Sequence, residues 1–303
     1  MSQIPYIVNS QWLTAELNTR AEKYLLIDMS KPGIYAQAHL FGAINVDYGR
    51  LQESGSAAGL PPSREEIEKL LSEVGLTENR HVIAYDEEGG TRAARFLWVL
   101  ALAGHNRFSY LDGGIHAWLA QDLPYSSEPC QPIRNTNESY KIAKLKTEPV
   151  VGLNDVLERF QDPNTVIWDA RSPEEYLGLK VGSRRGGHIP GAVNYNWENT
   201  IDRNNDNLLR PLEDIRDELQ ALGITAEKEV IVHCQTHHRS SFAWLLAKHL
   251  GYKNVRGYAG SWAEWGNSEQ TPVALPTAAE LAAYYSSLDK ELAHSEELGL
   301  ELV

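Results

Sequence analysis

The chain contains two copies of the same series of short sequence blocks, and this repeat constrains the fold more than any other feature. Leu-Ile-Asp at 26–28 matches Ile-Trp-Asp at 167–169, and Val-Ile-Ala-Tyr-Asp at 82–86 matches Val-Ile-Val-His-Cys at 230–234. Two further matches, in the same order, pair 38–45 with 187–194 and 112–118 with 259–265. Matched blocks in one order predict two copies of one domain, which agrees with a length of 303 residues.

The spacing between the copies predicts an insertion and the domain limits. Asp28 and Asp169 are 141 residues apart, whereas His39 and His188 are 149 apart, which places extra residues around 177–185. The Ser- and Pro-rich stretch 126–132 is typical of a linker. We expect a first domain at 1–128, a linker at 129–144, a second domain at 145–275 and a C-terminal helical tail at 276–303, with a helix from 277 to about 292.

Short apolar runs alternate with helical patterns in both copies. Strands are expected at 22–28, 81–85, 164–169 and 229–233, and helices at 65–74, 91–103, 211–222 and 240–250. Gly104 and Gly251 follow two of these helices, where glycine commonly ends a helix. The pattern predicts an α/β fold with two domains, each a central, mainly parallel sheet with helices on both faces.

Composition excludes several classes of function. Lys and Arg number 28 against 41 Asp and Glu, and a net charge of −13 disfavours binding to nucleic acid or to an anionic membrane surface. Two cysteines give no disulfide framework. No run of about 18 apolar residues is present, and the N-terminal residues do not resemble a signal peptide. We therefore expect a cytoplasmic protein with no nucleic-acid or membrane partner.

The candidate site begins at Cys234, directly after the expected strand 229–233. Ligand sites of open α/β sheets lie at the carboxyl ends of strands. The backbone N–H groups of such a loop can converge on an anion, and the positive end of the next helix favours negative charge. The loop residues between this strand and the helix are Cys234, Gln235, Thr236, His237, His238 and Arg239.

Positive charge near Cys234 would favour its thiolate over its thiol. Arg239, and His237 and His238 when protonated, would supply a local positive charge that the whole chain lacks. The stretch 176–197 contains no carboxylate and adds further basic residues, which are Lys180, Arg184, Arg185 and His188.

Other interpretations of these residues remain open. Cys234 could be a buried structural thiol, since unpaired Cys often behaves as a small core residue. The two loop histidines and the Arg184–Arg185 pair could be solvated surface residues. A metal site from His233, Cys234, His237 and His238 is disfavoured, because strand neighbours point to opposite faces and no common zinc pattern is completed. We therefore expect no metal site at this loop.

The first copy lacks the reactive group. Asp86 stands in the place of Cys234, and Glu87 and Glu88 follow it. Acidic residues there would repel an anion and provide no nucleophile. The first domain should therefore be catalytically silent, pack against the second and form one wall of the site.

Residues 5–272 resemble the tandem-domain rhodanese family, the thiosulfate and 3-mercaptopyruvate sulfurtransferases. The motifs that carry the resemblance are Asp-Ala-Arg-Ser at 169–172 with Glu175 and Tyr176, Gly-His-Ile-Pro-Gly-Ala at 187–192, the loop 234–239, and Gly-Tyr-Ala-Gly-Ser-Trp at 257–262. The resemblance implies transfer of sulfane sulfur through a persulfide on Cys234, without a cofactor. Residues 235–239 and Arg185 would then bind substrate, supported by Asp169, Arg171 and His188.

The loop departs from the best-known members of the family. Thiosulfate-using members carry Arg-Lys-Gly-Val-Thr after the cysteine and mercaptopyruvate-using members Gly-Ser-Gly-Val-Thr, whereas Gln-Thr-His-His-Arg here is similar to some bacterial rhodaneses. Thr236 stands where the thiosulfate enzymes have a lysine, and Glu175 where they have an arginine. Both changes remove positive charge, which Arg239, His237 and Arg185 are expected to replace.

The sequence thus predicts a thiosulfate sulfurtransferase that takes a small anionic sulfur donor and passes sulfur to cyanide or a thiol. A 3-mercaptopyruvate sulfurtransferase is the first alternative. A cysteine-dependent phosphatase of the related fold is a weaker one, because those enzymes place five residues between Cys and Arg and this chain has four. A non-enzymatic sulfur carrier is the third.

Overall fold

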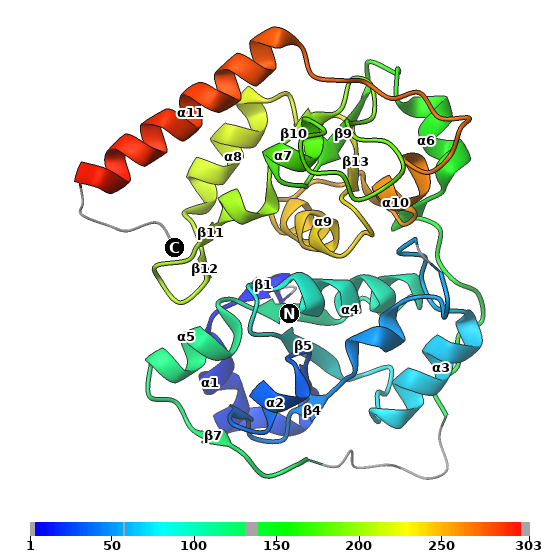
Figure 1. Cartoon of the computed structure of the whole chain (residues 1–303). Coiled ribbons are helices and arrows are strands. Elements are labelled where there is room, and N and C mark those ends of the chain that lie inside the picture. Colours follow the sequence, from blue (N-terminus) through cyan, green and yellow to red (C-terminus); the bar gives the residue numbers. More distant parts are fainter. Residues whose placement is uncertain (1–3, 57, 131–138, 298–303) are drawn as a thin grey trace.

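The first half of the chain forms a five-stranded parallel sheet (Figure 1). A computed structural model describes residues 4–56, 58–130 and 139–297. The strands, in the order β1-β6-β5-β2-β4, are β1 (Ile7–Val8), β6 (Phe108–Leu111), β5 (His81–Tyr85), β2 (Tyr24–Asp28) and β4 (Ile44–Asn45). All residues of the two central strands β2 and β5 are buried, as expected for strands covered on both faces.

The second half repeats this sheet. Its strands, in the order β8-β14-β13-β9-β10, are β8 (Val150–Val151), β14 (Val255–Tyr258), β13 (Glu229–His233), β9 (Thr165–Asp169) and β10 (Val193–Asn194). Every pair in both sheets is parallel. The predicted fold class is therefore confirmed. Each half also has a small antiparallel pair, β3 (His39–Leu40) with β7 (Tyr125–Ser126) in the first and β11 (Ile201–Asp202) with β12 (Leu208–Leu209) in the second.

Helices flank both sheets at the expected places. The first half contains α1 (Ser10–Arg20), α2 (Pro32–Tyr35), α3 (Arg64–Glu73), α4 (Thr91–Leu102) and α5 (Gly114–Ala120). The second contains α6 (Leu153–Arg159), α7 (Pro173–Tyr176), α8 (Leu212–Ala221), α9 (Arg239–His249) and α10 (Ser261–Trp265). Gly104 and Gly251 have φ angles of +82° and +93° just beyond α4 and α9, the conformation of a C-terminal cap.

Strand and helix limits differ from expectation by a few residues at most. The largest difference in the first half is at β2, which begins at Tyr24 rather than at 22, because residues Ala21–Lys23 form one turn of 3₁₀ helix. The C-terminal helix α11 (Ala278–Glu297) extends beyond the expected end near 292. No glycine or proline interrupts the sequence before Gly299, so nothing in the sequence stops the helix earlier.

The two halves pack through α4 and α9, which face each other in the middle of the molecule (Figure 1). One apolar cluster runs through both halves and includes Trp98 and Leu97 of α4 together with Phe242 and Trp244 of α9. Separate clusters fill the outer face of each sheet. The apolar core thus extends through the interface between the halves. The two halves therefore bury this surface against each other when the chain folds.

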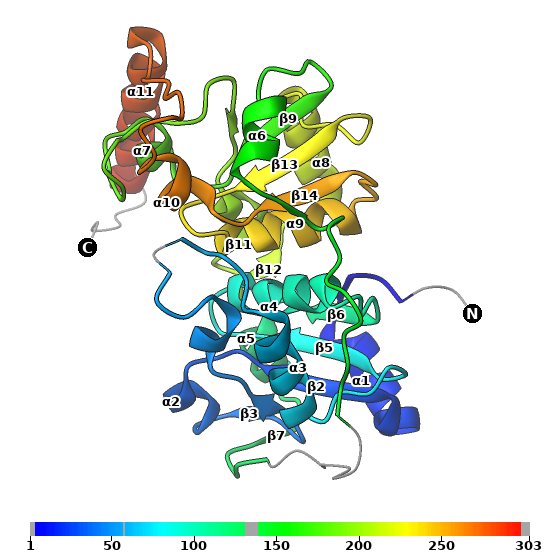
Figure 2. The ribbon, with the colours of Figure 1, turned by 90° about the vertical axis from the view of Figure 1, so that its right-hand side faces the viewer.

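Residues 139–149 lead into the second half over the face of the molecule that is turned to the viewer in Figure 2. Half of the expected linker, residues 131–138, lies outside the described residues. The tail helix α11 is held at its start by the side chain of Thr277, which exchanges hydrogen bonds with Glu280. It contacts α7 where Tyr284 donates a hydrogen bond of 2.5 Å to Glu174. None of the described helices is long and apolar enough to cross a membrane.

Candidate active site

Cys234 lies at the carboxyl end of the central strand β13, directly before the loop that leads into α9. Its side chain is 1% exposed and belongs to the apolar cluster shared by the two halves. Its carbonyl accepts from the N–H of Trp262 at 3.0 Å, and its N–H donates to the Ser261 hydroxyl at 3.4 Å. Strand and α10 therefore fix the backbone of the cysteine from both sides.

The loop after Cys234 is shaped as an anion cradle. Its central residue His237 has a φ of +55°, and His238 follows in the right-handed helical region. Successive residues of opposite hand turn their N–H groups toward one centre. Within the described residues, the N–H groups of 235–240 have no protein acceptor, and no side chain caps the start of α9. Unpaired donors at a helix start are what an incoming anion requires.

In the first half, a carboxylate of the protein itself occupies the equivalent cradle. There the carboxylate of Asp86 accepts four backbone N–H bonds of 2.8–2.9 Å, from Glu88, Gly90, Arg92 and Ala93. Asp86 matches Cys234 in the repeat. The first copy thus fills its own cradle with the Asp86 side chain, whereas the copy with cysteine leaves the equivalent donors unpaired.

The two loop histidines do not add positive charge, contrary to expectation. His237 is fully buried, with Nδ1 2.7 Å from the Ser240 hydroxyl and its ring packed edge-on against Trp98. Burial lowers the pKa of His237 well below its usual value. Burial likewise lowers the pKa of His238 to about 3, and its Nδ1 pairs with the Tyr48 hydroxyl. Both rings are neutral at physiological pH, because they cannot be hydrated there.

Arg239 remains charged, but it forms an ion pair with the carboxylate of Glu175. Its guanidinium donates two hydrogen bonds to Glu175, at 2.5 and 2.9 Å. Burial alone would raise the pKa of Glu175, but Arg239 lowers it below its usual value. Glu175 stands where the best-known thiosulfate enzymes have an arginine. Arg239 was expected to replace that lost positive charge, and it is in direct contact with Glu175. Much of the positive charge of Arg239 is therefore compensated before any donor arrives.

Arg185 lies in the inserted segment and fixes that segment against residues 265–271. Its guanidinium donates to the carbonyls of Trp265, Gly266, Ser268 and Thr271 and to the Thr271 hydroxyl. These contacts occupy all of its donor nitrogens, which argues against the expected contact with substrate. The insertion nevertheless reaches the loop, because the Gln235 amide donates to the Gly182 carbonyl and the Ser183 hydroxyl, each at 3.1 Å.

Asp169 and Arg171 form a buried ion pair below the cysteine. The guanidinium donates to both carboxylate oxygens, at 2.6–3.0 Å, and lies 4.5 Å from the ring centre of Trp262. Burial alone would raise the pKa of Asp169, but Arg171 lowers it to about 2. The backbone N–H of Trp262 donates to the Cys234 carbonyl, so the ion pair is connected to the start of the loop through Trp262.

His188 supports the fold rather than the chemistry. Its ring stacks on Tyr176 at 3.8 Å, and Nδ1 lies 3.0 Å from the Tyr176 carbonyl. In the first copy His39 stacks on Tyr35 at 3.8 Å with the same ring-to-carbonyl contact. A contact that both copies keep cannot depend on the cysteine.

Three residues of the first half reach the loop, and none of them was predicted from the sequence. Tyr48 contacts His238, and the chain at Gly59 lies so close to Thr236 that a Cβ atom there would be 1.7 Å from the Thr236 carbonyl oxygen. Arg95 of α4 is fully buried and lies 3.5 Å from the His237 carbonyl. The available signal was Arg95 itself, one charge inside an otherwise apolar stretch at 93–102.

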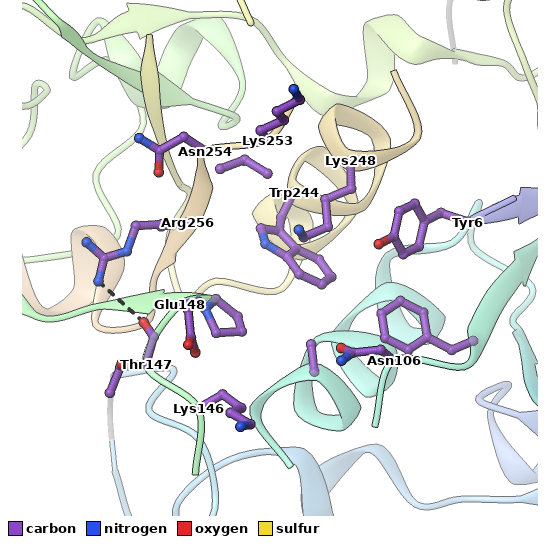
Figure 3. A pocket seen from close by; sticks show the side chains of 14 residues that line it. Tyr6, Asn106, Lys146, Thr147, Glu148, Trp244, Lys248, Lys253, Asn254 and Arg256 are labelled. Carbon is purple, nitrogen blue, oxygen red and sulfur yellow. Dashed lines mark hydrogen bonds between the residues drawn. The ribbon is translucent and has the colours of Figure 1, made fainter. Parts of the chain in front are cut away.

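A separate cavity of about 610 Å³ lies between the halves at the opposite, amino-terminal edge of the sheets (Figure 3). Trp244 and Lys248 of α9 project into it, facing Tyr6 and Asn106 of the first half. Cys234 is not part of its lining, so this cavity is not the cysteine site. Among the described residues, no group of three or more His, Cys, Asp or Glu side chains could hold a metal ion.

The repeated parallel sheet with a cysteine and an anion cradle at the carboxyl edge of one copy defines a rhodanese fold. The family model for the rhodanese-like domain matches residues 10–121 and again 153–268. The chain belongs to the rhodanese-like domain family, and two matches along one chain agree with the repeat seen in the sequence.

The chain is also similar to individual proteins. The chain is 43% identical over 275 residues to the thiosulfate sulfurtransferase of Azotobacter vinelandii, covering 90% of this chain and 98% of that protein. It is 40% identical to the thiosulfate sulfurtransferase of Pseudomonas aeruginosa with the same coverage. The structure of the anaerobic ergothioneine biosynthesis enzyme from Chlorobium limicola matches with a TM-score of 0.79 at 22% identity, over 90% of this chain and 70% of that chain. At this identity, the similarity to the ergothioneine enzyme shows a shared fold and nothing about function.

Proposed function

We propose that the protein is a thiosulfate sulfurtransferase that works by double displacement through a persulfide on Cys234. The Cys234 thiolate attacks the outer sulfur of thiosulfate, the sulfur–sulfur bond of the donor breaks, and its electron pair leaves on sulfite. Cyanide or a thiolate then attacks the outer sulfur of the persulfide, takes that sulfur as thiocyanate or a new persulfide, and restores the Cys234 thiolate. The step through a covalent intermediate divides one transfer into two easier ones.

One observation carries this proposal: the cradle beside Cys234 has unpaired N–H donors where the silent copy places a carboxylate. The outer sulfur of a persulfide carries negative charge and would occupy the position that the Asp86 carboxylate occupies in the first half. Preorganised N–H groups stabilise such a charge without further rearrangement. The relatives named thiosulfate sulfurtransferase support the choice of donor.

The loop length favours sulfur over phosphate. Four residues separate Cys234 from Arg239, and the two imidazoles between them are packed against Trp98 and Tyr48. A cradle this short and this tightly supported suits a single sulfur atom better than a tetrahedral phosphate. Because a thiol nucleophile must stay reduced, we place the activity in the cytoplasm. We further propose that the chain needs no metal or organic cofactor for this reaction.

The test is transfer of sulfur from thiosulfate to cyanide, followed as thiocyanate. We expect many turnovers per protein molecule, which distinguishes an enzyme from a sulfur carrier that delivers one sulfur and stops. Hydrolysis of an aryl phosphate and transfer from 3-mercaptopyruvate are measured beside it. Faster turnover of either alternative substrate than of thiosulfate would overturn the proposed function.

The Arg239–Glu175 pair should tune the affinity for a dianionic donor. Arg239→Gln leaves Glu175 as an uncompensated negative charge beside the site, so the KM for thiosulfate should rise by about tenfold or more, the value of one charge-assisted hydrogen bond. The measurement is KM and kcat for thiosulfate at fixed cyanide and low salt.

Glu175→Gln is the matched control, because it frees the charge of Arg239 instead of removing it. Its KM for thiosulfate should fall below that of the wild type. A rise in KM for both variants would show that the pair only maintains the shape of the loop.

A further inference from the structure

The cavity of about 610 Å³ between the halves is rich in positive charge, although the whole chain carries a net charge of −13. Among the described residues that line it, one side chain is acidic, that of Glu148, and four are basic. The basic side chains are Lys146, Lys248, Lys253 and Arg256 (Figure 3). A concave site with one predominant sign of charge concentrates small ions of the opposite sign. The cavity therefore favours an anion.

Carboxylates of the protein do not neutralise the lysines of this cavity. In the part of the chain that the structure describes, the lysines that form ion pairs are Lys31 and Lys141, which lie outside the cavity. Lys248 is half-buried, with its Nζ 5.5 Å from the ring centre of Trp244, and burial lowers the pKa of its amino group. A partly buried ammonium group without a counter-ion is unfavourable, and an anion in the cavity would offset that cost.

Two N–H groups of the lining lack an acceptor among the described residues, Nε1 of Trp244 and Nε of Arg256. The Trp244 side chain is fully buried yet borders the cavity, and in Figure 3 its indole nitrogen lies on the side of the ring toward Arg256. The other nitrogens of Arg256 already donate to the carbonyls of Thr147 and Val150 and to the carboxylate of Glu229. Because buried donors normally have an acceptor, these two N–H groups indicate a ligand that accepts hydrogen bonds.

Comparison of the two copies shows that the packing of the halves does not require these cations. When the glycines that end α4 and α9 are aligned, Ala101 and Asn106 of the first half stand where the second half has Lys248 and Lys253. Both residues of each matching pair line the cavity, so its two walls are related by the repeat but differ in charge. Since neutral residues serve on one wall, the lysines of the other wall need a separate explanation.

We propose that this cavity binds a small polar molecule with two or more phosphate or carboxylate groups, at a site separate from the cysteine loop. Its volume lies within the range of known small-molecule sites. Ammonium and guanidinium groups form strong, charge-assisted hydrogen bonds with the oxygens of both kinds of anion. Further polar side chains of the lining suit the uncharged part of such a molecule, and these are Asn106, Thr147 and Asn254. Because both halves and the segment 146–149 contribute to the lining, the ligand would also stabilise the packing of the halves.

The test is isothermal titration calorimetry of the full chain with pyrophosphate and, separately, with citrate, in the absence of a sulfur donor. At least one of the two probes should bind with a Kd of about 1 mM or lower at low salt, and the stronger probe distinguishes a phosphate from a carboxylate ligand. Lys248→Ala introduces the residue of the first half and should weaken this binding by about tenfold or more. Glu148→Gln removes the acidic side chain of the lining and should strengthen it.

Lys31→Ala is the matched control, because it removes a surface ammonium group that pairs with Glu87 and Glu88 outside the cavity. This variant should bind the probe as the wild type does. The probe should also raise the thermal midpoint of the wild type more than that of Lys248→Ala, and the midpoints without probe show whether each variant is folded.

Three results would overturn the proposal: no binding of either probe, equal affinity in Lys248→Ala and the wild type, or an equal loss of affinity in Lys31→Ala. Thiosulfate turnover of Lys248→Ala should stay within about twofold of the wild type, and a larger loss would contradict a separate site. The binding measurement needs no sulfur transfer, so absence of thiosulfate turnover in the wild type would overturn the proposed function alone.

Discussion

Cys234→Ser should reduce sulfur transfer from thiosulfate to cyanide by more than about 10³-fold, to the level of the buffer. A serine hydroxyl is a far weaker nucleophile than a thiolate and does not form the sulfur–sulfur bond of a persulfide. The fold should survive, because the hydrogen bonds at this position run through the backbone to Ser261 and Trp262. Thiocyanate production and the thermal midpoint of the variant are measured together.

Cys130→Ser is the matched control for this substitution. Cys130 follows β7 in the first half, far along the chain from the cradle, and its backbone N–H donates to the Tyr35 hydroxyl at 3.1 Å. Its removal should leave turnover within twofold of the wild type, on the order of 0.4 kcal/mol. Retained turnover in Cys234→Ser, or its loss in Cys130→Ser, would show that Cys234 is not the nucleophile.

Arg171→Met should destabilise the fold strongly, with a loss of about 3–5 kcal/mol in the free energy of unfolding. The change leaves the Asp169 carboxylate fully buried without its cation and removes the guanidinium from the face of Trp262. Urea unfolding followed by tryptophan fluorescence measures the loss.

The pH dependence of the stability loss in Arg171→Met shows whether the unpaired Asp169 carboxylate causes it. In the wild type Arg171 lowers the pKa of Asp169 to about 2, so the ionised carboxylate stabilises the fold above about pH 4, and that contribution is lost as the pH falls toward 2. Without Arg171, burial should raise the pKa of Asp169, as it raises the pKa of the matching Asp28, which has no arginine. Protonation then relieves the variant, and its deficit should shrink as the pH is lowered toward the ordinary range of a carboxyl group.

The double variant Asp169→Asn with Arg171→Met separates loss of the charge pair from loss of packing. It removes both charges and should recover more than half of the stability that Arg171→Met loses. A double variant as unstable as the single one would show that packing against Trp262, not the buried carboxylate, is responsible.

The sequence predicted the fold well because its signals are local and repeated. The central strands His81–Tyr85 and Glu229–His233 were predicted without error, since each contains a short apolar run rich in β-branched residues, which is typical of a buried strand. Glycines at 104 and 251 marked the ends of α4 and α9. The position of Cys234 at the carboxyl end of a strand followed from the same pattern.

The environment of the site was less predictable, because it depends on contacts between the halves. Basic residue type suggested positive charge for His237 and His238, but burial against Trp98 and Tyr48 keeps both neutral. Arg185 was expected near the donor, yet carbonyls around α10 engage its guanidinium. The single charge of Arg95 in an apolar stretch indicates a special role, but the local sequence does not show that α4 brings it to the loop of the other half.

The mass of the intact protein after incubation with thiosulfate tests the central claim most directly. A persulfide on Cys234 adds one sulfur atom, about 32 Da, and the covalent intermediate predicts that cyanide removes it again. The gain should be absent in Cys234→Ser and present in Cys130→Ser. An unchanged mass in the wild type under conditions of active turnover, or a gain that persists in Cys234→Ser, would contradict the account.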